Sequence, residues 1–312
     1  MVKRVHRVTT VVAQIEQVDP RVKLFDLQDP EGWVLPPFTA GAHIDIHLPS
    51  GLIRQYSLSG DPACDDTYTI AVQREEDGRG GSRELHDALH VGDELLVSLP
   101  RNTFPILDDA PVTMIAGGIG ITPFLSALPG LMAMDRPFKL HYCASSRDKA
   151  SFAAMLQQMD LGGRLQLHIS EGGQRLDLAQ VVAELGSEEH IYCCGPTRML
   201  DAVENAAESL GARLHVEHFG VAAGADPAYE VLLARSGQVV PVAPGQTMLQ
   251  ALRAADVHVP ASCEGGVCLD CKCRWLEGTP IHRELTMTKK DREEWITPCV
   301  SGSASQRLTL DL

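Results

Sequence analysis

The chain has 312 residues and a mass of 33.8 kDa, more than one hydrophobic core usually serves, so two or three domains are expected. Its 27 Lys and Arg against 41 Asp and Glu give a formal net charge of −14, which excludes a surface built to bind nucleic acid or an anionic membrane. A composition of 44% hydrophobic and 22% charged residues excludes disorder, and the polar N-terminus excludes a signal peptide, so we expect a cytoplasmic monomer with no membrane partner.

Short runs of alternating hydrophobic and polar residues fill the first hundred positions. These runs are RVTTVVAQIEQV, HIDIHL, RQYSLSG, YTIAVQRE and DELLVSL, and turn residues separate them. Alternation with a period of two is typical of strands in a small antiparallel barrel or sandwich. We therefore predict an antiparallel β-barrel over residues 1–104, with one helix, SRELHDAL, that begins after Ser82 as its N-cap.

Two motifs in this barrel are suited to a flavin nucleotide. The first is the strand segment Arg54, Gln55, Tyr56 and Ser57, and the second is the turn Gly80, Gly81 and Ser82. Alternation places the first motif's guanidinium and aromatic ring on one face, where they can meet a phosphate and a planar ring. The N–H groups and the hydroxyl of the second motif can hold a phosphate. Each motif alone also fits an ordinary strand or turn, and the two in this order favour flavin.

From residue 111 to 219 the pattern changes to alternating strands and helices. The runs VTMIAG, KLHYCAS, IYCCG and LHVEHF are predicted strands, with helical sequence between them. This alternation is typical of a parallel sheet covered by helices. We therefore predict an α/β domain with a parallel sheet over residues 105–221.

Glycine-rich turns at two strand ends of this domain form a candidate nucleotide site. The first turn has the pattern G-x-G-x-x-P, and a tight strand-to-helix turn without a ligand is the alternative interpretation. Ligands of such sheets bind where strand ends meet, so a second turn at another strand end strengthens the prediction. Ser145 and Arg147 follow a third strand, where they either hold an adenosine ribose or lie in a solvated loop. The residues of the two turns are Gly118, Gly120, Thr122, Cys194, Gly195 and Pro196.

A third unit follows a short linker. The segment GVAAGADPAYE is small, polar and contains proline, so we place a linker at residues 222–229. The sequence VLLARSGQVVPVAPGQTMLQALRAADV then predicts a hairpin and a helix, and RLTLDL predicts a closing strand. Residues 230–312 are therefore expected to form a separate domain of mixed strands and helix.

Five of the nine cysteines lie in the last fifty residues. Cys263, Cys268 and Cys271 have the spacing C-x4-C-x2-C, and Cys299 follows 28 positions later. This spacing is typical of the four thiolate ligands of a plant-type [2Fe-2S] cluster. The alternative is a structural zinc site, which more often uses two C-x2-C pairs. Three further cysteines are expected to be ordinary side chains: Cys64, Cys143 and Cys273.

Taken in order along the chain, the motifs resemble those of one family. They are RQYS, GGS, GGIGITP, CCGP, HVEHF and CEGGVCLDC. Over essentially its whole length the chain resembles the reductases of two-component Rieske-type oxygenases, of the phthalate dioxygenase reductase and vanillate O-demethylase reductase type. The resemblance implies an FMN-binding barrel, a NAD-binding α/β domain and a plant-type ferredoxin domain of β-grasp fold. It also implies an NADH-dependent oxidoreductase that passes electrons through FMN and the [2Fe-2S] cluster to a Rieske-type terminal oxygenase.

The resemblance assigns roles to the residues of these motifs. Arg54, Tyr56 and Ser57 contact the flavin, and Gly80, Gly81 and Ser82 hold its phosphate. Gly118, Gly120 and Thr122, with Cys194, Gly195 and Pro196, face the nicotinamide nucleotide, while Phe219 of HVEHF packs beside the isoalloxazine ring. Because the protein's task is to hold electron donors and acceptors in line, no general acid or base is expected, and Cys194 and Phe219 only shape the approach of nicotinamide to flavin.

Several alternatives remain open at the level of sequence. FAD could replace FMN, and Arg147 could meet the 2′-phosphate of NADPH. The acceptor could be an oxygenase of an aromatic acid, a methoxylated aromatic or a quaternary amine. Two other functional classes are a flavin reductase with a structural zinc loop and an electron-carrier module without enzyme activity.

The chain departs from the family pattern between its second and third clustered cysteines. Members of the family usually have small residues there, whereas this chain has Leu269 and Asp270. A carboxylate beside the cluster should favour its oxidised form. Asp270→Ala is therefore expected to raise the cluster's reduction potential, and an unchanged redox titration would contradict this.

Overall fold

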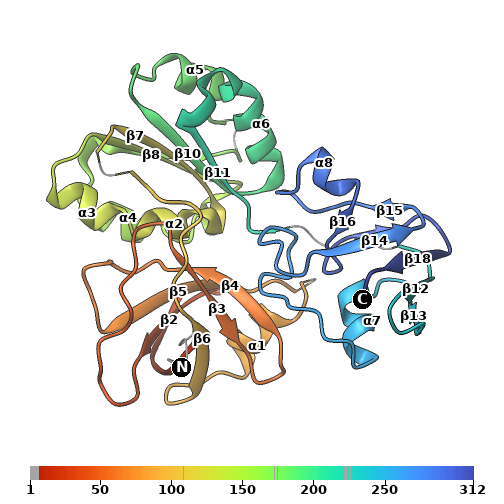
Figure 1. The fold of residues 1–312 in the computed structure, drawn as a ribbon. Coiled ribbons are helices and arrows are strands. Elements are labelled where there is room, and N and C mark those ends of the chain that lie inside the picture. Colours follow the sequence, from red (N-terminus) through yellow and green to blue (C-terminus); the bar gives the residue numbers. More distant parts are fainter. Residues whose placement is uncertain are drawn as a thin grey trace. The chain divides into compact units, whose positions relative to one another are not determined.

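The computed structural model describes residues 7–76, 78–107, 109–171, 173, 175–220, 224 and 226–312. The chain divides into two compact units, Met1–His218 and Phe219–Leu312 (Figure 1). Within the described ranges no helix is both long and apolar enough to cross a membrane. Each unit has its own hydrophobic core.

The first sheet of unit Met1–His218 is antiparallel and closes into a barrel. Its strands have the order β4-β3-β6-β1-β2-β5, and an isolated bridge from Leu58 to Ile70 links the two edges. Inward-facing residues such as Phe25 and Ile44 are completely buried and fill the interior. The predicted barrel is therefore confirmed. Its strands are β1 (Arg7–Asp19), β2 (Val22–Gln28), β3 (His43–His47), β4 (Ile53–Ser57), β5 (Thr67–Gln73) and β6 (Glu94–Ser98).

The barrel's helix α1 (Gly81–Asp87) begins differently from the prediction. Gly80 occupies the N-cap with a φ of 86°, and no side chain caps the helix. Ser82 lies inside the first turn, where its hydroxyl accepts a hydrogen bond of 3.0 Å from the backbone N–H of Glu75. The prediction of Ser82 as N-cap is wrong, because the left-handed backbone that glycine tolerates at Gly80 starts the helix two residues earlier.

The second sheet of this unit is entirely parallel, with the order β11-β10-β7-β8-β9. Phe124 and Leu128 pack on one face of the sheet, and Val181 and Leu200 pack on the other. The predicted α/β architecture is confirmed. The strands are β7 (Val112–Gly117), β8 (Phe138–Ala144), β9 (Leu165–Ile169), β10 (His190–Cys194) and β11 (Leu214–Glu217). The helices are α2 (Thr122–Leu125), α3 (Leu128–Ala133), α4 (Ala153–Gln158), α5 (Leu178–Ala183) and α6 (Thr197–Ala207), with the short 3-10 turns η1 (Gly118–Ile121), η2 (Arg147–Lys149), η3 (Gly162–Arg164) and η4 (Glu208–Arg213).

Unit Phe219–Leu312 contains a mixed sheet with the order β13-β12-β18-β14-β16. Helix α7 (Met248–Ala254) begins with a capping box formed by Thr247 and Gln250, and its apolar side packs on the sheet. The predicted hairpin, helix and closing strand are all present. The strands are β12 (Tyr229–Leu233), β13 (Val239–Val242), β14 (Cys273–Glu277), β16 (Trp295–Ile296) and β18 (Arg307–Leu310), beside the small pair β15 (Pro280–Ile281) and β17 (Gly302–Ser303) and helix α8 (Lys289–Arg292).

Part of the predicted linker cannot be compared with the structure. Residues 222, 223 and 225 of the range 222–229 lie outside the described residues. Strand β12 begins at Tyr229, the last position of that range. The structured part of this unit therefore begins no later than residue 229.

Two cysteines outside the clustered set differ in their surroundings. Cys143 lies buried in β8, and burial raises its pKa to about 12, as expected for an inert apolar side chain. Cys64 is exposed, in a turn where its N–H donates to the carbonyl of Asp61. The Asp-Pro turn keeps the segment of Cys64 at the surface.

Candidate functional site

The two glycine turns of the parallel sheet meet at neighbouring strand ends. Strands β7 and β10 pair in parallel, with Ala116 opposite Cys194. A Cβ atom on Gly120 would lie 2.5 Å from the carbonyl carbon of Cys194 and 2.8 Å from the nitrogen of Gly195. Any side chain at Gly120 would therefore force the two turns apart. The absence of a side chain at Gly120 therefore allows the backbones of the two turns to lie in contact.

The space beside Gly118 is open in the structure. Its φ is 56°, and a Cβ atom there would meet no atom within 4 Å. Thr122 is buried at the start of α2, and Pro123 follows it in the first turn of that helix. Pro196, at the N-cap of α6, is exposed. The structure thus brings the predicted glycine turns together and leaves room beside Gly118 for a ligand.

A buried carboxyl that the sequence analysis missed lies beside the second turn. Glu217 ends β11, directly opposite Cys194 at the end of β10, and the two side chains hydrogen-bond. Burial raises the pKa of Glu217 to about 8 and holds that of Cys194 well above its ordinary value, so both carry protons near neutral pH. The Oε2 atom of Glu217 is buried and has no partner in the described part of the protein. In the sequence, Glu217 is marked only by its place in the run HVEHF.

Glu217→Gln is expected to make stability less dependent on pH. Because burial raises the pKa from 4.5 to about 8, the folded protein holds this proton more tightly than the unfolded chain does. The wild type therefore loses stability as the pH rises through this window, and an amide, which has no such proton, removes the loss. Melting curves should show the variant gaining on the wild type between about pH 5 and about pH 9.

The control for this comparison is Glu188→Gln. Glu188, in the turn before β10 of the same unit, is exposed. Its substitution should change the melting temperature by a similar amount at both pH values. If Glu217→Gln also changed the melting temperature by the same amount at both pH values, the result would contradict the burial of this carboxyl.

The two halves of the predicted flavin motif lie together in the barrel. Arg54 on β4 is buried and donates to the carbonyl of Arg79 at 2.8 Å. A Cβ atom on Gly81 would lie 2.5 Å from Cγ of Arg54, so the arginine side chain packs directly on this glycine. Burial raises the pKa of Tyr56. The guanidinium groups of Arg54 and Arg79 oppose this rise, so both lie near the phenol. Arg54, Tyr56 and the glycine turn therefore form one cluster of residues.

The remaining residues of the predicted flavin and nucleotide sets differ in exposure. Ser57 is buried and Gln55 is half-buried, both on β4. Ser145 and Arg147 are exposed just after β8, at the same edge of the sheet as the glycine turns. Phe219, two residues past the end of β11, is 47% exposed. An exposed aromatic ring of this size is available to contact a ligand.

The cysteine loop of unit Phe219–Leu312, residues 263–271, places N–H donors around its sulfur atoms. The sulfur of Cys263 accepts hydrogen bonds from the N–H groups of Gly265 at 3.3 Å and of Cys268 at 3.4 Å. The sulfur of Cys299 accepts one from Gly266. Such N–H groups stabilise thiolates, which are the form that binds iron. The loop is therefore suited to hold thiolate ligands.

In the described residues the four thiols associate in two pairs. Cys268 hydrogen-bonds Cys263, which lowers the pKa of Cys263 to about 5 and raises that of Cys268. Cys299 hydrogen-bonds Cys271. No group of three or more His, Cys, Asp or Glu side chains in this part of the chain is arranged to hold a single metal ion. Two thiols on each of two irons is the donor set of a [2Fe-2S] cluster, so the arrangement fits the cluster better than one tetrahedral zinc.

Cys273 takes no part in this arrangement. It is the first residue of β14, opposite Ile296 of β16, and its side chain belongs to the hydrophobic core of the unit. Burial raises its pKa to about 12, so it stays a neutral thiol. Its predicted role as an ordinary side chain agrees with this position.

Two residues of the cysteine loop adopt a left-handed backbone without being glycine. Glu264 has a φ of 49° and Leu269 a φ of 62°. Glu264 is buried and forms an ion pair of 2.6 Å with Arg253 of α7, which helps to hold its conformation. Leu269 stands where the resembled family usually has a small residue, and its backbone explains that preference.

Leu269→Gly is expected to stabilise the holoprotein. A left-handed backbone destabilises a residue with a side chain by about 1–2 kcal/mol, and glycine removes this strain. Glycine also gives the unfolded chain more conformational freedom, which offsets up to about 1 kcal/mol of the gain. The net gain in the free energy of unfolding should be about 0.5–1 kcal/mol, measured by denaturant titration. Leu276→Gly, in β14, is the control and should destabilise the protein. A loss of stability in both variants would contradict strain at Leu269.

Comparison with known proteins identifies two of the domains. Residues 114–205 match the family model described as an oxidoreductase NAD-binding domain, and residues 231–302 match the model of a 2Fe-2S iron-sulfur cluster binding domain. Among solved structures, phthalate dioxygenase reductase has a TM-score of 0.88 and 34% identity, with 98% of both chains covered. Its title describes a modular structure for electron transfer from pyridine nucleotides to [2Fe-2S]. The match to the 2Fe-2S cluster binding domain favours the iron–sulfur cluster over the zinc alternative.

Curated relatives match over nearly the whole chain. The phenoxybenzoate dioxygenase subunit beta of Ectopseudomonas oleovorans is 45% identical over 299 residues, with 93% of each chain covered. The vanillate O-demethylase oxidoreductase of Pseudomonas sp. strain HR199 is 41% identical over 293 residues, with 90% of this chain and 92% of the relative covered. The chain belongs to the family of oxidoreductases that includes phthalate dioxygenase reductase and vanillate O-demethylase oxidoreductase, the NAD-binding, [2Fe-2S] reductase components of oxygenase systems.

Proposed function

We propose that the protein is the NADH-dependent reductase of a two-component oxygenase and delivers electrons to it by way of FMN and a [2Fe-2S] cluster. One observation carries this proposal: a NAD-binding domain and a [2Fe-2S] domain lie on a single chain that matches phthalate dioxygenase reductase over 98% of its length. A bound flavin accepts two electrons from a nicotinamide and releases them singly, which an iron–sulfur cluster requires. The chain therefore combines the parts that convert hydride transfer into single-electron delivery.

The barrel, assigned as residues 1–104, would hold the FMN. Tyr56 would stack on the ring, and the cluster of Arg54 with the turn Gly80, Gly81 and Ser82 would bind the phosphate. Gln55 and Ser57 on the same strand would supply hydrogen bonds to the flavin. The packing of Arg54 on Gly81 supports this assignment, because it fixes the cation beside the free backbone of the turn.

The α/β domain, assigned as residues 105–221, would hold NADH at its two glycine turns. The turn with Gly118, Gly120 and Thr122 would bind the pyrophosphate in the open space beside Gly118. Cys194, Gly195 and Pro196 would contact the nicotinamide, and the unpartnered Oε2 of Glu217 is available to its amide group. Ser145 and Arg147 would hold the adenosine ribose, and Phe219 would pack beside the flavin ring.

The third domain, assigned as residues 230–312 after a linker at 222–229, would hold the cluster. Cys263 with Cys268 would bind one iron, and Cys271 with Cys299 would bind the other. The pairing of the thiols and the N–H groups directed at Cys263 and Cys299 support this ligand set. Residues 227–312 contain nine Lys or Arg and ten Asp or Glu, so most of the net negative charge lies elsewhere in the chain.

The electron acceptor is proposed to be a Rieske-type terminal oxygenase. The relatives named as a dioxygenase subunit and as a demethylase oxidoreductase support an acceptor that oxidises an aromatic acid or a methoxylated aromatic. The protein is proposed to act as a cytoplasmic monomer. Reconstitution with purified oxygenases of each class tests the acceptor, because only the correct one should couple NADH oxidation to product formation.

The visible spectrum of the purified protein tests the cofactors. Bands of both flavin and [2Fe-2S], bleached together by NADH without oxygen, are the expected result. Flavin bands alone would overturn the proposal in favour of a flavin reductase, and [2Fe-2S] bands without flavin would indicate a simple electron carrier. Extraction of the flavin followed by chromatography distinguishes FMN from FAD.

A further inference from the structure

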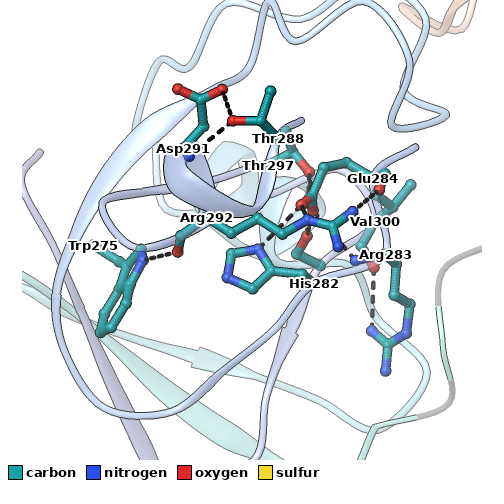
Figure 2. A network of polar contacts seen from close by, with 10 residues as sticks. Trp275, His282, Arg283, Glu284, Thr288, Asp291, Arg292, Thr297 and Val300 are labelled. Carbon is teal, nitrogen blue, oxygen red and sulfur yellow. Dashed lines mark hydrogen bonds and ion pairs between the residues drawn. The ribbon is translucent and has the colours of Figure 1, made fainter. Parts of the chain in front are cut away.

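Glu284 is a fully buried carboxylate in the second unit that the proposed function does not use. It lies between β15 and α8, beside His282 and Arg292 (Figure 2). Its side chain has no exposed surface. Its Oε1 accepts a hydrogen bond of 2.7 Å from Nε of Arg292, and its backbone carbonyl accepts another of 2.7 Å from the same guanidinium. A buried carboxylate is costly unless it is fully hydrogen-bonded, so its partners indicate what it stabilises.

The other oxygen of Glu284 holds the turn that contains Cys299. Oε2 accepts hydrogen bonds from the hydroxyls of Ser301 at 2.8 Å and Thr297 at 3.4 Å. These two residues stand two positions after and two positions before Cys299. The N–H of Ser301 also donates to the carbonyl of Thr297 at 3.0 Å, which closes the turn. One carboxylate therefore fixes both ends of the turn that presents the Cys299 thiol.

The segment around Glu284 also contacts the loop that carries the other cysteines. The N–H of Leu285 donates to the carbonyl of Gly266 at 2.9 Å, and the hydroxyl of Thr286 donates to the carbonyl of Val267 at 2.7 Å. A Cβ atom on Gly266 would lie 3.1 Å from Cα of Glu284 and 2.7 Å from the side chain of Val300. The segment thus lies directly between the cysteine loop and the Cys299 turn.

The residue before Glu284 reinforces the same turn. Nη1 of Arg283 donates to the carbonyl of Val300 at 3.1 Å (Figure 2). The same atom also binds the carboxylate of Asp226 at 2.8 Å. The backbone N–H of Arg283 donates to Oε2 of Glu284 at 3.2 Å. The residues on both sides of Cys299 are therefore held from one short segment of chain.

The charge of Glu284 is balanced within the described network. Nδ1 of His282 lies 3.2 Å from Oε1, and Arg292 supplies a permanent positive charge. Burial by itself raises the pKa of Glu284, but its hydrogen bonds and the neighbouring cations outweigh burial and lower it below the ordinary value. The carbonyl of Arg292 in turn accepts a hydrogen bond of 3.0 Å from the indole of Trp275 in β14, which anchors the cation to the sheet.

We propose that Glu284 is a positioning residue for the fourth cluster ligand: its carboxylate fixes the turn from Thr297 to Ser301 so that Cys299 stays aligned with the other three cysteines. This inference rests on the proposed cluster ligands. Groups that orient metal ligands from behind typically affect metal retention by about tenfold to a hundredfold. Loss of the carboxylate should therefore loosen the hold on the cluster without unfolding the domain.

The test compares Glu284→Ala with Glu284→Gln in the purified holoprotein. The rate at which a chelator removes iron, the EPR spectrum of the reduced cluster and the melting temperature are measured for each. Alanine should speed iron release by about tenfold or more and shift the EPR spectrum. Glutamine can still accept from Arg292 and can donate to the two hydroxyls, and it loses only the bond from the N–H of Arg283, so it should restore most of the wild-type behaviour. Glu294→Ala, which removes the exposed partner of Arg274, is the control and should behave as wild type.

A second variant serves where Glu284→Ala does not fold. Ser301→Ala removes one hydroxyl and leaves the carboxylate with its other partners, so the fold is kept. It should release iron several-fold faster than the wild type with a closely similar melting temperature. Iron release and EPR spectra equal to wild type in Ser301→Ala, or in a folded Glu284→Ala, would overturn the inference. A wild-type protein that binds no [2Fe-2S] cluster would instead refute the proposed function.

Discussion

Cys271→Ala is expected to abolish the [2Fe-2S] cluster, whereas Cys273→Ala should retain it. The two cysteines are two residues apart and almost equally buried, with 3% and 6% of their surfaces exposed. Both side chains border the hydrophobic core of the unit, but of the two only Cys271 pairs with another clustered thiol, Cys299. Because both substitutions remove the same atom, the difference between them isolates ligation from packing.

The two cysteine variants are expected to differ strongly in bound iron and in electron delivery. Cys271→Ala should lose nearly all bound iron and acid-labile sulfide and all electron delivery to the oxygenase. Its NADH-dependent reduction of a soluble dye through the flavin should persist, because the first unit is untouched. Cys273→Ala should keep the cluster and lose about 1 kcal/mol of stability from the small cavity. Retention of the cluster in Cys271→Ala, or its loss in Cys273→Ala, would contradict the ligand assignment.

Gly120→Ala is expected to lower NADH-driven flavin reduction by about a hundredfold, the typical cost of displacing a reaction site by about an ångström. The added Cβ would lie 2.5 Å from the carbonyl carbon of Cys194 and 2.8 Å from the nitrogen of Gly195. Both neighbours are backbone atoms, which cannot rotate away as a side chain would. The two turns that are proposed to hold the nucleotide must therefore separate.

The matched control for this substitution is Gly130→Ala. Gly130 lies in α3 of the same unit, and a Cβ atom there would meet no atom within 4 Å. Alanine should stabilise the helix by about 1 kcal/mol and leave flavin reduction unchanged. Stopped-flow measurement of flavin reduction at several NADH concentrations checks both variants. A wild-type rate in Gly120→Ala would show that the glycine turns do not position the nucleotide.

Much of the fold follows from hydrophobic patterning. The predicted barrel strands and the four predicted strands of the parallel sheet are present. Strand β2 was missed because two adjacent hydrophobic residues, Leu24 and Phe25, break the alternation of its run VKLFDLQ. The edge strand β9 was missed because it is only partly buried. Strands β14 and β16 were also missed, because β14 has mostly exposed side chains and β16 is very short. In each case pairing with neighbouring strands of the sheet stabilises a segment of weak local pattern.

Some residues of the candidate site could be predicted from the sequence and others could not. Glycines and cysteines were found because their spacing along the chain directly reflects turns and ligand sets. Glu217 and Glu284 were not found, because their importance comes from partners that only the folded chain supplies: Cys194 in one case, and Arg292 and Ser301 in the other. A single glutamate in a strand or loop gives no local signal of burial.

EPR spectroscopy after a single addition of NADH tests the central claim most directly. In the holoprotein without oxygen, the account predicts that NADH produces the signal of a reduced [2Fe-2S] cluster. In protein stripped of its flavin, NADH should leave the cluster oxidised, and added FMN should restore the signal. Reduction of the cluster at the same rate without flavin, or no reduction in the holoprotein, would contradict the proposed path from NADH through FMN to the cluster.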